Sequence, residues 1–349
     1  QRTEASRVRR FAREVGTMLG RPPQFLKCNV HLADVDLRAA LQQRADTIGR
    51  AGAMEVRFFD LYDVEARRLL LRDLPIDHAG VSATEPRRVH LIILGMGRMG
   101  RAVVARAARV GHFANAVLDP SRRLRISFID RDAAQREAAL LFRYRQIRNC
   151  CDLDGHEMNV ESEDARKLIE GWCSDPAAIC CLVICFDDEA RAFEVALRLD
   201  PVAREHGARV GLRLARRSGL ASVMALLGEP SPADAMRPFG MLEDGCCSEA
   251  FTEGGSEILA KAIHENYVKD EKKKGLPDNP SLRAWQDLIE SFRESNRQQA
   301  DHIVIKLRAI GCDIVAMTAP RPAITAFDGP GGGAMSEVEL LARMEHNRW

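Results

Sequence analysis

A glycine-rich hexapeptide, Gly95-Met96-Gly97-Arg98-Met99-Gly100, is the part of the sequence best suited to bind a phosphorylated ligand. It directly follows the apolar run Val89–Leu94 and precedes a helical pattern over Arg101–Val110. Where a strand turns into a helix, the first glycine of GxGxxG permits the tight turn, the second lets the backbone approach a diphosphate, and the third lets the helix pack closely. The helix N-terminus adds free N–H donors and the positive end of its dipole. The spacing predicts a diphosphate site at these six residues, and the alternative is a glycine turn that binds nothing.

An acidic residue, Asp130, ends the next apolar run, Leu124–Ile129. A carboxylate at this place can accept hydrogen bonds from both ribose hydroxyls of an adenosine. The usual offset from the glycines is about 20 residues, and the longer spacing here is explained by an insertion over His112–Arg123. Asp130 would repel a 2′-phosphate and therefore favours NAD(H) or another ADP-containing ligand over NADP(H), whereas the neighbouring Arg131 opposes that preference.

The sequence contains no pattern typical of catalysis or of metal binding. Ten cysteines include three adjacent pairs but no CxxC, and HExxH and GxSxG are absent. We therefore predict no catalytic residue and no metal ligand. Several cysteines lie in apolar runs, where they behave as small hydrophobic residues, and this use of cysteine favours a reducing compartment.

Composition excludes some broad classes of protein. Lys and Arg number 51 and Asp and Glu 50, for a net charge of +1. This balance argues against a general nucleic-acid binder, which needs excess positive charge to neutralise phosphates. No apolar run approaches the roughly 18–20 residues that cross a bilayer. The sequence starts at Gln1 and stops at Trp349 inside a helical pattern, so we expect it to be part of a longer protein.

The glycine motif lies in a segment that alternates strand and helix from residue 88 to residue 244. Repeated βα units of this length predict a doubly wound, Rossmann-like parallel sheet. Its expected strands are Val89–Leu94, Leu124–Ile129, a strand near His156–Val160, Ile179–Phe186, Arg209–Leu214 and a last strand near Arg237–Leu242, with a short helix over Leu220–Leu227 before the last.

The flanking segments differ from the central one. Residues 1–20 are a basic lead-in, followed by two strand–helix units with strands Phe25–Leu32 and Glu55–Phe59 and helices Asp34–Ala45 and Asp60–Arg72. The segment Asp73–Pro86, rich in Pro, Gly, Asp and Ser, is a predicted boundary. After Gly245 two amphipathic helices, Glu257–Lys269 and Trp285–Ala309, are joined by a charged loop, and Gly311 ends the second. The stretch 320–333 is predicted to be flexible, and a helix with a capping box starts after Ser336.

The central segment resembles the TrkA-N, or RCK, nucleotide-binding domain of potassium channels and transporters. The resemblance rests on HLIILGMGRMGRAVVARAA, LRISFIDRD and CCLVICFDDEA, and upstream FFDLYDVEARRLL resembles the lead-in of membrane-tethered members. Where the family often has Gly-Asp after the third strand, this chain has Asn159-Val160-Glu161-Ser162, which leaves the adenosine selectivity open. The resemblance implies an NAD(H) or related adenine nucleotide ligand, pairing into a homodimer or larger homo-oligomer, and an upstream membrane domain.

The C-terminal helices resemble the ryanodine-receptor (RyR) repeat domain in its prokaryotic form. The residues are LAKAIHENY and NPSLRAWQDLIESFRESNRQQADHIVIKLRAIGC, and the terminal ELLARMEHNRW is similar to the start of a second copy. The expected domains are therefore 1–86 (lead-in and small α/β segment), 87–245 (Rossmann domain), 246–320 (RyR-like repeat) and 334–349 (start of a second repeat). The resemblance implies a second-ligand site, with Trp285 able to stack on a base; packing between helices and a solvated polar face are the alternative roles. The candidate residues are His264, Tyr267, Trp285, Asn296 and Arg297.

These observations together predict a ligand-sensing regulatory protein. It would be the cytoplasmic nucleotide-binding portion of a channel- or transporter-like potassium system, on the cytosolic side of a membrane-tethered protein. An NAD-dependent oxidoreductase is the alternative, and an empty structural scaffold is a third. The segment after the sheet resembles a repeat module rather than the catalytic domain of a dehydrogenase, which favours regulation over catalysis.

Overall fold

The computed structural model describes residues 10, 14, 18, 26–34, 37–38, 40–42, 44–45, 54–216, 219–220, 236–240, 255–274, 279–315, 324, 326–328 and 335–348. Apart from isolated positions, the basic lead-in 1–20, the predicted helix Leu220–Leu227 and the predicted flexible stretch 320–333 lie outside these residues. The described chain forms two compact units. One comprises Gln1–Val64 with Cys246–Arg297, and the other Glu65–Gly245 with Gln298–Trp349.

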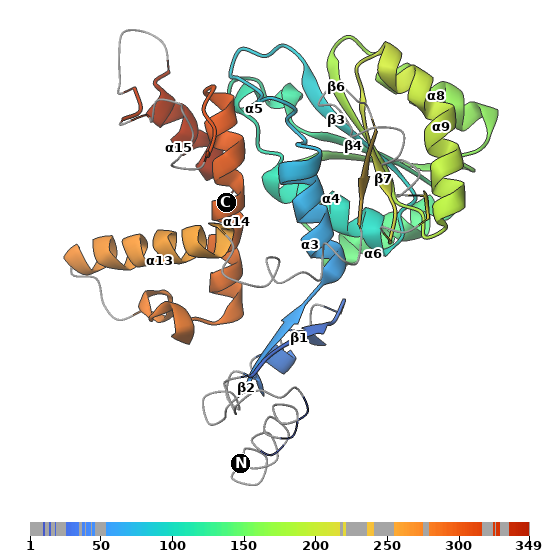
Figure 1. The fold of residues 1–349 in the computed structure, drawn as a ribbon. Coiled ribbons are helices and arrows are strands. Elements are labelled where there is room, and N and C mark those ends of the chain that lie inside the picture. Colours follow the sequence, from blue (N-terminus) through green and yellow to red (C-terminus); the bar gives the residue numbers. More distant parts are fainter. Residues whose placement is uncertain are drawn as a thin grey trace. The chain divides into compact units, whose positions relative to one another are not determined.

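A six-stranded parallel sheet forms the centre of the second unit (Figure 1). The order β5-β4-β3-β6-β7-β8 is that of a doubly wound Rossmann-like sheet, with the strand order reversing between β3 and β6. The mixed α/β fold predicted from the sequence is therefore confirmed for this unit. Its strands are β3 (Arg88–Leu94), β4 (Arg125–Asp130), β5 (Asp152–Glu157), β6 (Ala178–Ile184), β7 (Arg209–Arg213) and β8 (Met236–Phe239).

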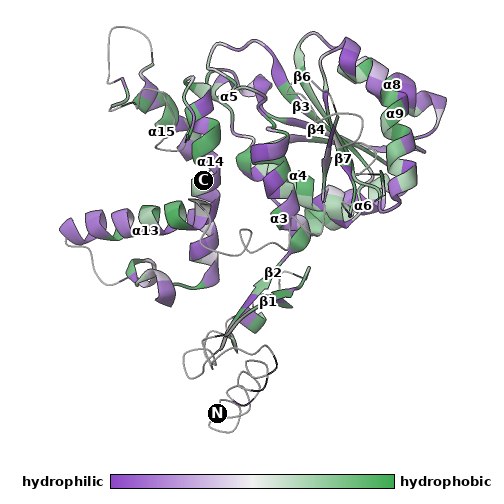
Figure 2. Ribbon diagram, in the orientation of Figure 1, coloured by the Kyte–Doolittle hydropathy of each residue, from purple (hydrophilic) through white to green (hydrophobic). Residues whose placement is uncertain are grey.

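The two central strands, β3 and β6, are buried over almost their whole length, as their continuous apolar sequences require. By contrast, β5 begins four residues before the predicted strand near His156–Val160. This strand lies at one end of the sheet and reads Asp-Leu-Asp-Gly-His-Glu, so its hydrophobic signal is weak. Figure 2 shows the apolar residues gathered in the sheet, whereas α13 (Gly255–Lys273) is largely hydrophilic.

Helices cover both faces of the sheet. α4 (Arg98–Val110) and α6 (Ala133–Arg143) lie on one side, and α8 (Glu163–Cys173) and α9 (Glu189–Glu205) on the other (Figure 1). Residues such as Ile169 of α8 and Leu199 of α9 pack in one apolar cluster with Ile92 and Leu182 of the sheet. The predicted insertion between α4 and β4 contains a short helix, α5 (Ala114–Leu118), a 3-10 turn, η2 (Pro120–Arg122), and the buried Phe113. Another short helix, α7 (Ile147–Cys150), precedes β5.

The predicted boundary segment 73–86 belongs to the sheet unit. α3 (Leu61–Arg68) continues into a π-helical turn, η1 (Leu69–Asp73). Leu69 and Leu74 are buried against β7, where a Cβ at Gly211 would lie 3.3–3.4 Å from their methyl groups. The Pro- and Gly-rich composition that predicted a boundary therefore belongs to a packed segment.

The C-terminal part of the sheet unit consists of residues 298–309 of α14 (Glu290–Ala309) and α15 (Glu337–Arg348). Gly311 follows α14 with φ +74°, as predicted for a C-terminal glycine. Ser336 accepts a hydrogen bond from the Glu339 N–H at 3.2 Å, which confirms the predicted helix start. α14 begins five residues after the predicted Trp285, because a 3-10 turn, η4 (Trp285–Asp287), comes first.

The other unit contains a two-stranded parallel sheet, β1 (Leu26–His31) and β2 (Met54–Phe59), together with α13, η3 (Pro280–Leu282), η4 and the first residues of α14. Gln42 ties a neighbouring helical segment to β2, because its side chain bonds both Val56 O and Phe58 N. The predicted charged loop after Lys269 is wrong over residues 270–273, where α13 continues. Neither Gly nor Pro interrupts this stretch, and Lys272 and Lys273 suit the negative end of a helix dipole.

Candidate functional site

The glycine motif forms the turn between β3 and α4. Gly95 has φ +90°, and a Cβ there would lie 2.7 Å from the ring of Phe186. Its N–H donates to Ile129 O at 2.9 Å, which joins the turn to β4. A Cβ at Gly100 would lie 2.2 Å from Gly95 O. The first and third glycines are therefore required by the close approach of backbone and ring, as the motif predicts.

Gly97 differs from the other two glycines because space lies beside it. It is the N-cap of α4, without a side-chain cap, and no described heavy atom lies within 4 Å of a Cβ built at this position. The first N–H groups of a helix have no partner within the helix. The turn therefore offers backbone donors and a positive dipole end beside space that a side chain would fill, which is what a phosphate group needs.

The two methionines of the motif contribute to the core. Met96 is fully buried and Met99 nearly so. Arg98 is exposed at the first position of α4. Of the motif residues, the glycines and the backbone amides thus form the candidate binding surface, and Arg98 is the only one whose polar side chain is exposed.

Asp130 is attached to the glycine turn. Its Oδ2 accepts a hydrogen bond from Met96 N at 2.7 Å, and its Oδ1 accepts one from Asp132 N at 2.9 Å. Arg131 lies in the same β4–α6 turn and donates to Asn159 Oδ1 at 3.2 Å. The structure therefore brings Asp130 and the glycine turn together. It also gives the Asn159–Ser162 segment structural partners, since Ser162 caps α8 through Ala165 N.

Phe186 and Arg191 form the other side of the turn, and the sequence analysis did not single them out. Phe186 follows β6, the strand at which the order reverses, and Arg191 lies over its ring at 4.7 Å. Arg191 also pairs with Glu161 at 2.6 Å. Their position just after a strand next to the switch point was the available signal. Cys185 precedes them, and burial raises the pKa of its thiol to about 12, so the thiolate needed for nucleophilic chemistry is disfavoured.

Three of the five predicted second-ligand residues lie together. The rings of His264 and Trp285 are 5.9 Å apart, and His264 Nε2 lies 2.7 Å from Arg283 O. The Tyr267 hydroxyl lies 3.3 Å from Ser281 Oγ. These contacts hold α13 to the segment before α14, and they satisfy the polar atoms named here without a ligand.

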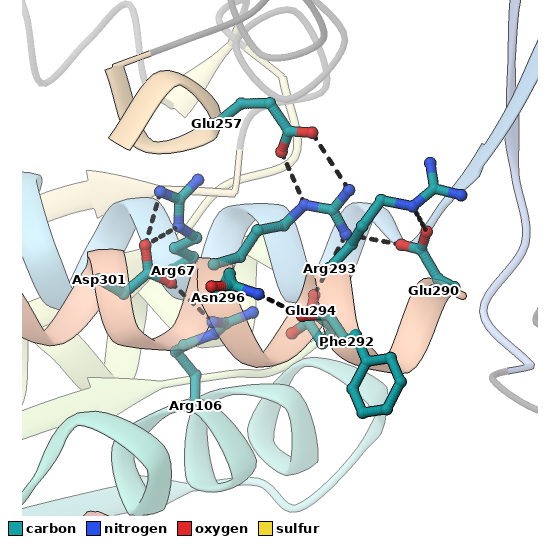
Figure 3. A network of polar contacts seen from close by, with 10 residues as sticks. Arg67, Arg106, Glu257, Glu290, Phe292, Arg293, Glu294, Asn296 and Asp301 are labelled. Atoms are coloured by element: carbon teal, nitrogen blue, oxygen red, sulfur yellow. Dashed lines mark hydrogen bonds and ion pairs between the residues drawn. The ribbon is translucent and has the colours of Figure 1, made fainter. Parts of the chain in front are cut away.

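The other two, Asn296 and Arg297, belong to a polar network on α14 (Figure 3). Asn296 donates to Phe292 O, while Arg297 binds Glu257 through Nε and Nη2 and Glu290 through Nη1. Burial alone would lower the pKa of Arg297, but these carboxylates more than offset it and raise the pKa. All three guanidinium nitrogens of Arg297 thus have carboxylate partners, and its role in the structure is to link α13 to α14.

A second network holds α4 in the sheet unit (Figure 3). Arg106 of α4 donates to Asp301 Oδ2 at 2.9 Å, and Arg67 donates to Asp301 Oδ1 at 2.7 Å. Arg106 and Asp301 are each only 2% exposed. Because α4 starts at the glycine turn, this buried pair fixes the helix whose N-terminus faces the candidate site.

Among the described residues, no group of three or more His, Cys, Asp or Glu side chains is arranged to hold a metal ion. Within the same ranges, no helix combines the length and apolar character of a membrane span. A comparison with known protein families finds no match, and a comparison with curated proteins finds none.

Proposed function

We propose that this chain binds an adenine nucleotide, with NAD(H) as the first candidate, at the turn between β3 and α4. The observation that carries the proposal is the open side of Gly97 at the N-terminus of α4, beside an acid that is bonded to the same turn. The diphosphate would bind the first amides of α4. The ribose would lie at Asp130, whose two oxygens each hold one backbone N–H and retain lone pairs for ribose hydroxyls.

The proposed role is regulatory. Nucleotide binding would favour one arrangement of the protein over another, in the manner of a ligand that binds two states unequally. The resemblance of the sequence to the TrkA-N domain supports a place on the cytoplasmic side of a membrane-tethered potassium channel or transporter, as a homodimer or larger homo-oligomer. The resemblance of the C-terminal helices to RyR repeats supports a second ligand or partner near His264 and Trp285.

The test is a titration of the protein with NADH, followed by calorimetry and by thermal unfolding. At 100 times its dissociation constant, a bound ligand adds about 2.7 kcal/mol to the free energy of unfolding. Gly97→Val should abolish binding and leave the fold intact, because the new side chain enters open space. Gly171→Val on α8 is the matched control, since a Cβ there also meets no described atom.

Two results would contradict the proposal. The absence of binding by NADH, ADP-ribose, ADP and ATP would leave the glycine turn as a structural element. Consumption of NADH with a panel of carbonyl substrates would assign the protein to the oxidoreductases.

A further inference from the structure

Four arginines lie on the two helices that follow β3 and β4, and we call them the arginine cluster: Arg98 and Arg101 on α4, and Arg136 and Arg143 on α6. α4 carries no acidic residue at all. Nearby Glu137, the one acid of α6, pairs with Arg148 at 2.5 Å. The cluster is thus a local excess of positive charge in a protein whose total charge is +1.

Arg101 lies at the centre of this excess. Within the part of the chain that the structure describes, no carboxylate forms an ion pair with it. Burial, followed by the charges of Arg136, Arg143 and Arg98, lowers its pKa, although an arginine stays protonated in proteins. A half-buried guanidinium among like charges is destabilising unless an anion accompanies it.

Arg136 also lacks a close carboxylate partner among the described residues, and one of its nitrogens lacks a hydrogen bond. Among the described residues, its only carboxylate contact is Asp132, at 3.6 Å, which is longer than a hydrogen bond. Its Nε is buried and has no hydrogen-bond partner in the described structure. An oxygen from outside the chain would satisfy this donor.

The positions of Arg101 and Arg136 indicate which part of a nucleotide they would contact. The Arg101 N–H bonds to Gly97 O, so Arg101 lies in the turn of α4 that starts at the open glycine. Arg136 lies in the first turns of α6, whose preceding residues are Asp130 and Asp132. Arg101 is therefore one helical turn from the proposed diphosphate site, and Arg136 is one helical turn after the acids at the end of β4, where the ribose is proposed to bind.

We infer that the nucleotide bound here carries a terminal phosphate group in addition to any diphosphate bridge, and that Arg101 and Arg136 bind that phosphate. A terminal phosphate, joined through a single ester or anhydride oxygen, carries close to two negative charges at pH 7 and accepts the paired N–H groups of a guanidinium. The inference rests on the proposed function. Two sources have this chemistry, the 2′-phosphate of NADP(H) and the terminal phosphate of ATP. Asp130 opposes the first source through charge repulsion, whereas it does not bear on the second.

The experiment compares the affinities of NADPH with NADH and of ATP with ADP by calorimetry. In at least one pair, the ligand with the extra phosphate should bind more tightly by roughly 10- to 100-fold, as one or two hydrogen bonds between ionised groups provide. The pair that shows the difference identifies the source of the phosphate.

Variants assign the effect to residues. Arg101→Gln and Arg136→Gln should each reduce that preference several-fold and leave the affinity for the ligand without the extra phosphate within about twofold. Arg166→Gln is the control, because Arg166 is exposed on α8 and pairs with Glu170 four residues on. Circular dichroism and denaturant unfolding of each variant verify the fold.

The outcomes separate the two proposals. Equal affinities within both pairs, with NADH still bound, would overturn this inference and leave the proposed function standing. A preference that survives both glutamine variants would also overturn it. If none of the four nucleotides binds, the proposed function fails and this inference fails with it.

Discussion

α4 presents two faces with arginines in opposite circumstances. On one face Arg106 is buried and bonded to Asp301, which Arg67 also holds. On the other, Arg101 is half-buried and its charged neighbours are three more arginines. Arginine therefore has different roles on the two faces. Arg106, which is paired with a carboxylate, fixes the helix, whereas Arg101, which lies among like charges, is available to an anion. The comparison predicts opposite signs for substitutions on the two faces.

The largest effect is expected on the paired face. Asp301→Asn keeps the size of the side chain but removes the charge that compensates Arg106. Breaking a buried ion pair in this way costs about 3–5 kcal/mol of the free energy of unfolding. Urea unfolding measures it, and Glu339→Gln is the control, because its pair with Arg343 is exposed and contributes below about 0.5 kcal/mol. If the two variants lose equal stability, the buried pair does not fix α4.

A fall in pH is expected to have a smaller effect on the free energy of unfolding, through a histidine that follows α4. His112 lies just after α4, and His302 Nε2 bonds to its carbonyl at 3.1 Å. Burial, followed by the charges of His302 and Arg348, lowers the pKa of His112 from 6.5 to about 4. The unfolded chain therefore takes up the proton first, and the native state loses about 2–3 kcal/mol as the pH falls from about 6.5 to about 4.

His112→Gln should reduce the loss of free energy of unfolding between pH 7 and pH 4.5 by about 2–3 kcal/mol. The rest of the dependence should remain, because burial also lowers the pKa values of His78, His90 and His302. His346→Gln, on the exposed side of α15, should retain the full dependence. An unchanged slope in the His112 variant would show that other groups account for the acid sensitivity.

The smallest effect has the opposite sign and lies on the other face. Arg101→Gln removes one charge from a cluster of four, and so should raise the free energy of unfolding by about 0.2–0.5 kcal/mol at low salt. The gain should disappear at about 1 M salt, where the Debye length is near 3 Å. A loss of stability in this variant, in the absence of nucleotide, would mean that the two faces of α4 do not differ as described.

Much of the sheet could be predicted from the sequence because its signals are local. Val89–Leu94 and Ile179–Phe186 are continuous apolar runs, and the glycine spacing alone predicts the turn to which Asp130 is hydrogen-bonded. The Arg106–Asp301 pair joins residues 195 positions apart, and no local pattern distinguishes it from two solvated helix faces. The same holds for Arg297, which the sequence places on a polar stripe and the structure surrounds with Glu257 and Glu290. The segment 73–86 shows the converse, since turn-forming composition does not reveal burial.

Two charged residues of α14 form ion pairs within the sheet unit, and these pairs affect how the protein folds during its synthesis. Asp301 reaches Arg106, and Arg308 reaches the buried Asp77 at 2.6 Å. A polypeptide excised after Gly245 would hold every strand of the sheet and yet leave Arg106 and Asp77 without their counter-charges. During synthesis, the sheet would therefore reach its final stability only after Asp301 and Arg308 of α14 had left the ribosome.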